Sequence, residues 1–345
     1  MSLALPRPSV QSTTLPCPHP RAARLAAAPA ATPPRPQTLA DLPPRQLAAR
    51  LASGQLLLRC GPFTLRLRSP LPAVAEGLAL AYAGFALVGQ HEFADFHVAL
   101  LPETGLRRWW RPQVRFWLDQ KPSMPLAAPQ AFAMLEWGLN WCVASHAHQY
   151  LVMHAAVVEK NGQALLLPAP SGAGKSTLCA ALVHRGWRLL SDELALLDMA
   201  SGQLHGMARP VNLKNGAIDV IRRFAPDAVL SAPVPGTIKG TVALMRAPDD
   251  AVRRMHEPAR PAWIVLPRWQ AGAATQLQPH SAAPAFMLRA GQGFNYGVQG
   301  PAGFEALSRL VDQCSCQQLV YGDLDDALGR LDALLDHPPS TGSTP

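Results

Sequence analysis

The chain has 345 residues, of which 48% are hydrophobic, and a formal net charge of +8. That length is sufficient for two domains with a sizeable core. No stretch of about 18 residues is apolar throughout, so we predict no membrane-spanning helix and no membrane partner. The N-terminus lacks the basic and apolar segments of a secretory signal. The positive charge fits an anionic partner such as a nucleotide and does not by itself indicate nucleic acid.

The six cysteines do not form a recognisable metal-binding pattern. Cys60, Cys142 and Cys179 lie in apolar segments, where we expect buried, reduced thiols. Cys314 and Cys316 form a close pair, but no second Cys or His pair occurs at the spacing of a zinc site. We therefore expect a soluble, cytoplasmic protein.

Both ends of the chain are predicted to be disordered tails. Residues 1–36 contain no Asp or Glu and are rich in Pro and Ala, a composition that cannot form a packed core. A transit peptide is an alternative for this segment, but its proline density argues against the amphipathic helix that such peptides need. Residues 338–345 are predicted to form the second tail.

Residues 37–126 are predicted to form a small α+β module. Its expected elements are helices at 38–53 and 73–85, a hairpin at 56–68 and strands at 93–101 and 114–118. No catalytic constellation occurs in it, so we expect it to dock a partner or to regulate. The segment 107–111, Arg-Arg-Trp-Trp-Arg, could stack on bases or form a strand edge with half-buried tryptophans. We favour the second interpretation and do not expect nucleic acid as a partner.

Residues 127–337 are predicted to form the second domain. A helix at 130–148 carries Trp137 and Trp141 four residues apart, which indicates a core stripe. A β-rich run at 150–158 follows, and the Asn-Gly pair at 161–162 predicts a hairpin to a strand at 164–167. His154 lies in the middle of the first strand. A lone strand histidine is usually structural, so a functional role depends on its position relative to the loop that follows.

That loop is rich in small residues and precedes a helix. The strand at 164–167 leads into residues 170–174, and Lys175 opens a helical pattern that ends at Gly186. Backbone N–H groups and a helix N-terminus together bind phosphate. Lys175 would reach the outer phosphates and the Ser176 hydroxyl would bind Mg²⁺. The predicted nucleotide-binding residues are Ser171, Gly172, Ala173, Gly174, Lys175, Ser176 and Thr177.

The loop departs from the usual phosphate-binding pattern at one position, where Ala169 replaces the first glycine. A glycine-rich helix start that binds nothing is the alternative interpretation. The flanking strand and helix favour nucleotide binding.

Two adjacent carboxylates, Asp192 and Glu193, end the next predicted strand at 187–191. Carboxylates at a strand end beside a phosphate loop coordinate Mg²⁺ in nucleotide sites. With two carboxylates, one could bind the metal ion and the other could lie near the acceptor hydroxyl. The alternative interpretation is that the pair caps a helix or lies in a solvated turn. Single cations in the loop-rich segment 208–260 are candidates to neutralise transferred charge: Arg209, Lys214 and Lys239.

The remaining chain is predicted to alternate between short strands and helices. Its expected elements are strands at 194–198, 204–207, 263–266 and 316–321, a helix at 304–311 and a closing helix capped by Asp323.

Several of these motifs resemble the catalytic domain of HPr kinase/phosphorylase, and more closely the group called HprK-related kinase A. The matching stretches are 136–141 (Glu-Trp-Gly-Leu-Asn-Trp), 153–156, 170–176, 185–193, 294–296 and 303–304. The resemblance implies an α/β fold shared with phosphoenolpyruvate carboxykinase, in which a mixed sheet carries the phosphate loop. The hairpin predicted at 161–162 agrees with such a sheet and disagrees with a doubly wound parallel one.

The resemblance also implies a role for each site residue. Lys175 would bind phosphates, and Ser176 and Glu193 would bind Mg²⁺. Asp192 would be the base that takes the acceptor's proton, and His154 would lie near the transferred phosphate. Residues 237–241 replace the family's Glu-Ile-Arg-Gly-Leu-Gly signature, so we do not expect HPr itself as the substrate.

The sequence thus predicts a Mg²⁺·ATP-dependent kinase that phosphorylates a serine-type hydroxyl of a protein, a peptide or a small molecule. The alternative is an ATP-binding switch or scaffold that docks a partner through the N-terminal module without phosphotransfer. Related kinases assemble as hexamers, and the resemblance leaves a homo-oligomer open.

Overall fold

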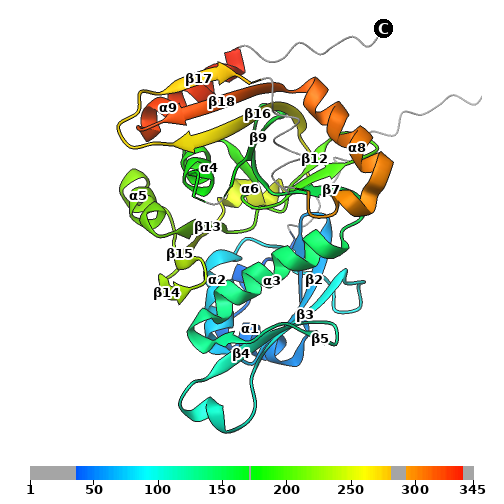
Figure 1. Ribbon diagram of the computed structural model, residues 1–345. Coiled ribbons are helices and arrows are strands. Elements are labelled where there is room, and N and C mark those ends of the chain that lie inside the picture. The colour runs from blue at the N-terminus through cyan, green and yellow to red at the C-terminus, as the bar shows by residue number, and fades with distance from the viewer. Residues whose placement is uncertain (1–35, 171, 281–292, 337–345) are drawn as a thin grey trace, which may run out of the picture. The chain divides into compact units, whose positions relative to one another are not determined.

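The computed structural model describes residues 36–170, 172–280 and 293–336 (Figure 1). The two predicted tails, apart from Pro36, lie outside these residues, as does Ser171. The described residues belong to one compact unit, and the predicted domain boundary at 126/127 stays a prediction. No helix in this part of the chain has both the length and the apolar character needed to cross a membrane.

The first sheet is built from the N-terminal third of the chain. Its strands follow the order β1-β2-β3-β4-β5, with β6 also on β4. The predicted hairpin is confirmed, because β1 and β2 pair antiparallel and Cys60 lies opposite Phe63. The elements are η1 (Leu39–Asp41), α1 (Pro44–Ser53), β1 (Leu56–Cys60), β2 (Phe63–Arg68), α2 (Pro72–Ala81), β3 (Phe96–Pro102), η2 (Leu106–Trp109), β4 (Gln113–Leu118), β5 (Lys121–Pro122) and β6 (Leu126–Ala127).

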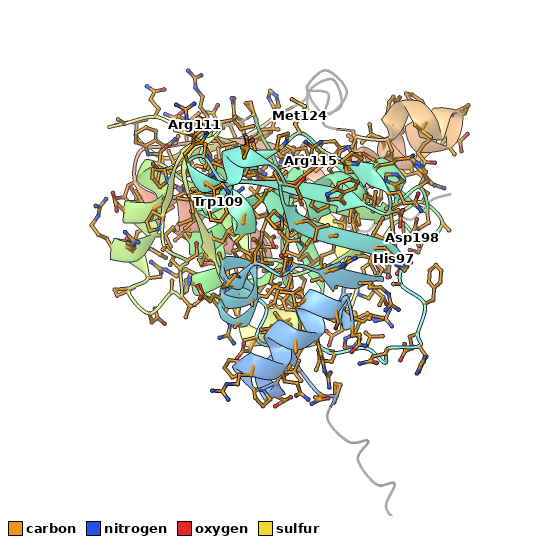
Figure 2. The ribbon with its side chains drawn as sticks, turned by 90° about the horizontal axis from the view of Figure 1, so that it is seen from below. His97, Trp109, Arg111, Arg115, Met124 and Asp198 are labelled. Carbon is orange, nitrogen blue, oxygen red and sulfur yellow. The ribbon has the colours of Figure 1, made fainter. Side chains whose placement is uncertain are left out.

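The predicted strand edge at 107–111 is wrong. The chain forms the short 3₁₀ helix η2 there, and the Trp109 and Trp110 side chains are 77% and 78% exposed. Met124, between β5 and β6, is 83% exposed, and Figure 2 labels Trp109 and Met124 near the strands of the first sheet. These tryptophans contribute little to the core.

The main sheet is mixed, as the sequence predicts. Its order is β10-β8-β9-β16-β18-β17, in which β9, β16 and β18 run parallel and the outer pairs are antiparallel. Asn161 and Gly162 both have positive φ, 56° and 78°, as a two-residue hairpin turn requires. The strands are β8 (Ala155–Lys160), β9 (Gln163–Pro168), β10 (Arg188–Ser191), β16 (Arg260–Trp269), β17 (Gln276–Pro279) and β18 (Ser315–Tyr321).

Helices cover both faces of the main sheet (Figure 1). Alternate residues of β9 belong to different core clusters, since Leu165 packs with α4 and α9 whereas Leu166 packs with α8. The predicted Asp323 cap is confirmed, because its carboxylate accepts the Asp326 N–H. The helices of this half are α4 (Lys175–His184), α5 (Gly216–Phe224), α6 (Asp249–Arg253), α8 (Tyr296–Gln313), α9 (Leu324–Asp332) and η4 (Ala333–Asp336).

The single strand predicted at 150–158 is wrong, because the chain breaks at His154. β7 (Tyr150–Met153) pairs with β11 (Ala195–Asp198) in a small sheet, which β12 (Leu204–His205) completes. β8 then enters the main sheet. One apolar run therefore serves two sheets, and His154 lies at the corner between them. A third sheet has the order β13-β15-β14, formed by β13 (Val211–Lys214), β14 (Val234–Thr237) and β15 (Gly240–Met245).

Helix α3 (Ala131–His146), preceded by η3 (Ala128–Gln130), packs directly on the first sheet. A Cβ atom at Gly138 would lie 2.1 Å from Phe116 Cε2, so only glycine permits this approach. One hydrophobic cluster contains residues of α3, of the first sheet and of the main sheet.

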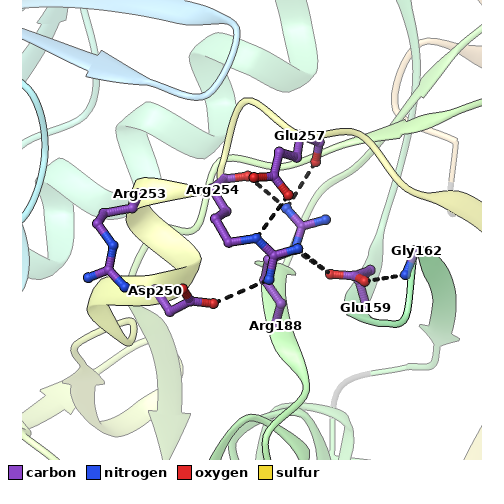
Figure 3. Close-up of polar contacts among 7 residues, drawn as sticks. All are labelled: Glu159, Gly162, Arg188, Asp250, Arg253, Arg254 and Glu257. Carbon is purple, nitrogen blue, oxygen red and sulfur yellow. Dashed lines mark hydrogen bonds and ion pairs between the residues drawn. The ribbon is translucent and has the colours of Figure 1, made fainter. Parts of the chain in front are cut away.

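A buried ion pair holds the end of the β8–β9 hairpin against β10 (Figure 3). Arg188 is paired with Glu159, and both side chains are at most 4% exposed. The Glu159 carboxylate also accepts the Gly162 N–H, and Arg188 donates to the carbonyls of Arg254 and Glu257 at 2.7 and 2.9 Å. Since β10 leads directly into Asp192, this network fixes the strand that delivers the two carboxylates.

Candidate functional site

The loop between β9 and α4 has the conformation of a tight turn around two glycines. Gly172 and Gly174 have φ values of 89° and 91°. A Cβ at Gly174 would also lie 2.5 Å from the Tyr321 hydroxyl, so no larger residue fits. Ala169, the departure from the glycine pattern, is buried directly after β9, where the chain has not yet turned. α4 begins at Lys175.

The first turn of α4 faces the end of β10. Lys175 is 7% exposed and its Nζ donates to the Asp192 carbonyl oxygen at 2.6 Å. Ser176 Oγ donates to Asp192 Oδ2 at 3.1 Å, and the Asn212 N–H donates to the same oxygen at 3.1 Å. Side chains 16 and 17 residues apart in sequence thus meet, because β10 and α4 lie beside the same loop.

Burial and the charges of nearby lysines shift the pKa values of the titratable groups in this region in different directions. Burial raises the pKa of Asp192, and Lys175 opposes that shift without cancelling it. Burial also favours neutral Glu193, but the ammonium groups of Lys175, Lys239 and Lys214 outweigh it and lower the pKa. Burial, reinforced by Lys175, lowers the pKa of His154 to about 4. Near neutral pH the imidazole is therefore uncharged and Glu193 is ionised.

Buried polar atoms without a hydrogen-bond partner are concentrated here. Five of the nine such atoms among the described residues are His154 Nδ1, Asp192 Oδ1, Glu193 Oε1 and both amide atoms of Asn212. Each unsatisfied buried group costs about 1–3 kcal/mol, so native structures retain few of them away from functional positions. Their concentration leaves this region with several polar atoms that a ligand or water could contact.

The three cationic residues singled out in the segment 208–260 lie in two different environments. Lys214 Nζ lies 3.7 Å from Glu193 Oε1, and Lys239 contributes to the same electrostatic environment. Arg209 instead belongs to a buried structural network, in which its guanidinium bonds to Glu136 at 2.8 Å and to Asn140 at 2.9 Å. Its charge is thus already paired with Glu136, and a role of Arg209 in neutralising transferred charge stays a prediction.

An open pocket of about 310 Å³ adjoins Glu193. Its walls include the aromatic side chains of Trp137, Trp141 and Phe294, and the charged residues Glu193 and Lys239 also line it. Trp141 is 48% exposed, so its assignment to the core is wrong. The period of four residues placed both tryptophans on one helix face correctly, but periodicity does not tell whether that face is covered. Asn212, which lies beside Asp192, carries no sequence signal that could have identified it.

The donor set fits a magnesium ion that is shared with phosphate oxygens better than a protein-only metal site. In the described part of the chain, no three His, Cys, Asp or Glu side chains come close enough together to hold a metal ion. Mg²⁺ is usually bound by one or two carboxylates, water and substrate phosphates. The Ser176 hydroxyl, together with Asp192 Oδ1 and Glu193 Oε1, which have no hydrogen-bond partner, provides such a partial set.

Comparisons with known proteins give one family match. The model of the family described as "ScmC: SynChlorMet cassette protein ScmC" matches residues 130–212. That segment contains His154, Lys175, Asp192 and Glu193, whereas Lys239 and Phe294 lie outside it. No curated protein matches the chain.

Among solved structures, the Hpr(Ser) kinase/phosphatase from Coxiella burnetii matches with 12% sequence identity. The match covers 54% of this chain and 97% of that chain, with a TM-score of 0.23.

Proposed function

We propose that the protein is a Mg²⁺·ATP-dependent phosphotransferase that transfers a phosphoryl group to a serine-type hydroxyl of a protein, a peptide or a small molecule. The observation that carries this proposal is the meeting of Lys175 and Ser176 with Asp192 beside five unpartnered buried polar atoms. A lysine and a hydroxyl at the start of a helix, with a carboxylate at the end of a neighbouring strand, are parts that phosphoryl transfer uses.

The loop before α4 would bind the phosphates of ATP. Its residues Ser171, Gly172, Ala173, Gly174, Lys175, Ser176 and Thr177 would supply backbone N–H groups and the N-terminal end of the α4 dipole. A Cβ added at Gly172 would meet no atom within 4 Å, so the loop has an open side. Lys175 would leave the Asp192 carbonyl to contact the outer phosphates.

Asp192 is the proposed base. Its Oδ1 is buried and has no partner, and burial raises its pKa, which makes the carboxylate a better proton acceptor. The proton of the acceptor's hydroxyl group moves to Asp192, and the hydroxyl oxygen of the acceptor forms a bond to the γ-phosphorus of ATP. The bond between the γ-phosphorus and the oxygen that bridges it to the β-phosphate breaks, which releases ADP. Mg²⁺, held by Ser176 and Glu193, would neutralise phosphate charge. Neutral His154 would contact the transferred group.

The hydrogen bond from Ser176 to Asp192 favours a second assignment of the two carboxylates. Asp192 would then share the cation with Ser176, and Glu193 would take the proton. Titration of Mg²⁺ into the Asp192→Asn and Glu193→Gln variants with bound ATP separates the assignments, because the variant of the metal-binding residue needs more Mg²⁺ for half-maximal ATP affinity.

The test of the function is labelling with γ-³²P ATP in a lysate separated by size into proteins and small molecules. The expected result is one labelled fraction with the wild-type protein and none with Lys175→Ala. ATP binding without any labelled acceptor would contradict phosphotransfer and favour the switch or scaffold alternative. Size-exclusion chromatography of the purified protein would test the predicted homo-oligomer.

A further inference from the structure

The pocket beside Glu193 places an aromatic surface next to one of the two proposed site carboxylates. We propose that this pocket, which we name the acceptor pocket, binds an aromatic group that the phosphate acceptor carries next to its reacting hydroxyl. The proposal rests on the phosphotransferase function above and adds to it the chemical class of the acceptor.

The acceptor pocket combines charged and aromatic side chains. Glu193 and Lys239 both line it, and Lys239 Nζ lies 5.2 Å from the centroid of the Trp137 ring. Trp141, Phe294 and Val298 also line it and are 48%, 50% and 70% exposed. Large apolar side chains that are exposed together mark a binding surface. An occupant that carries both a hydroxyl and an aromatic group matches this lining.

The size and remaining polar groups fit the same occupant. The volume of about 310 Å³ lies at the lower end of the range for small-ligand pockets, enough for one aromatic side chain with its backbone. Trp137 Nε1 is buried without a hydrogen-bond partner, so it is available to donate to a carbonyl oxygen. Aromatic walls bind another ring in edge-to-face or offset geometry.

The position of the pocket favours the acceptor over the adenine base of ATP. Its lining comes from α3, from the β10–β11 connection, from the β14–β15 turn and from residues 294–298, and none of the described residues of the phosphate loop lines it. In an in-line transfer the acceptor oxygen approaches opposite the leaving group. A pocket that touches Glu193 but not the loop therefore lies on the acceptor side of the carboxylates.

The experiment compares two blocked dipeptides by calorimetry, N-acetyl-Ser-Phe-amide and N-acetyl-Ser-Ala-amide, in the presence and absence of Mg²⁺ and a non-hydrolysable ATP analogue. We expect the Phe peptide to bind about tenfold more tightly to the wild-type protein. Trp141→Ala and Phe294→Ala should each remove most of this preference. Trp110→Ala is the matched control, since Trp110 is 78% exposed and does not line the pocket.

Equal affinities for the two peptides, or a preference that survives Trp141→Ala, would overturn the proposal. Loss of ATP-analogue affinity in Trp141→Ala with an unchanged peptide preference would overturn it in favour of a base-binding pocket. Failure of the proposed function looks different. No acceptor would then be labelled from γ-³²P ATP, whereas the peptide preference measured without nucleotide would still decide whether the pocket binds an aromatic group.

Discussion

At the scale of single residues, the environment gives the two neighbouring carboxylates different pKa shifts. Asp192 and Glu193 are neighbours in sequence, yet the pKa of the first is raised and that of the second is lowered. The difference arises because three lysines surround Glu193, whereas Asp192 is almost completely buried at 3% exposure. Adjacent groups with opposite shifts are suited to different roles.

The substitution Asp192→Asn tests the proposed base. We expect turnover to fall by about 10²–10⁴, because the amide keeps the shape of the side chain but cannot accept the proton. The nucleotide affinity should stay near that of the wild-type protein, as measured with a fluorescent ATP analogue. Asp219→Asn, on an exposed carboxylate of α5, is the control. Full activity of Asp192→Asn would exclude Asp192 as the base.

His154 should make the stability of the metal-free protein depend on pH. Its pKa is about 4 in the folded protein, whereas the ordinary value of a histidine is 6.5. Between these pH values the imidazole therefore binds more protons in the unfolded chain than in the folded protein. The His154 contribution to the free energy of unfolding is therefore complete above pH 6.5 and is lost as the pH falls toward 4. Urea denaturation of the wild type and His154→Gln should show a difference that changes with pH only in this window. A constant difference would contradict the burial of a neutral imidazole.

At the scale of elements, α3 connects the first sheet to the candidate site. One face lies against Phe116 and the opposite region contributes Trp137 and Trp141 to the acceptor pocket. Glu136 of the same helix accepts from Tyr82 at 2.5 Å and is paired with Arg209. Arg209 thereby connects α3 to the segment that leads into β13, the strand that carries Asn212.

Arg209→Met should therefore destabilise the protein strongly. Arg209 and Glu136 are 8% and 3% exposed, and removing one partner of a buried ion pair costs about 3–5 kcal/mol. Arg222→Met is the matched control, because its pair with Asp219 is exposed on both sides and such pairs contribute at most about 1 kcal/mol. Chemical denaturation measures both. Equal effects of the two substitutions would show that the buried network does not hold α3 in place.

At the scale of the whole molecule, ligand binding should increase the free energy of unfolding. A ligand present at about 100 times its Kd stabilises the folded state by about 2.7 kcal/mol. We expect Mg²⁺·ATP to raise the unfolding temperature of the wild-type protein, and removal of Mg²⁺ with EDTA to reduce the increase. Lys175→Ala should abolish most of it. An unchanged increase in that variant would place the nucleotide elsewhere.

The sequence by itself determined the local elements and the chemistry. The Asn-Gly hairpin and the helix that starts at Lys175 follow from signals contained within a few residues. Hydrogen bonding and turn geometry are local, so such features can be predicted without knowing which segments later meet.

Only the tertiary structure decided which faces are buried and which residues meet. The break at His154 arises because one apolar run pairs with two different sheets, and strand pairing is non-local. The burial of Trp141 and Arg209 differs from what the sequence predicts. Trp141 lines an open pocket, whereas Arg209 pairs with Glu136 in the interior. Periodicity and charge describe one chain segment, whereas burial depends on what packs against it.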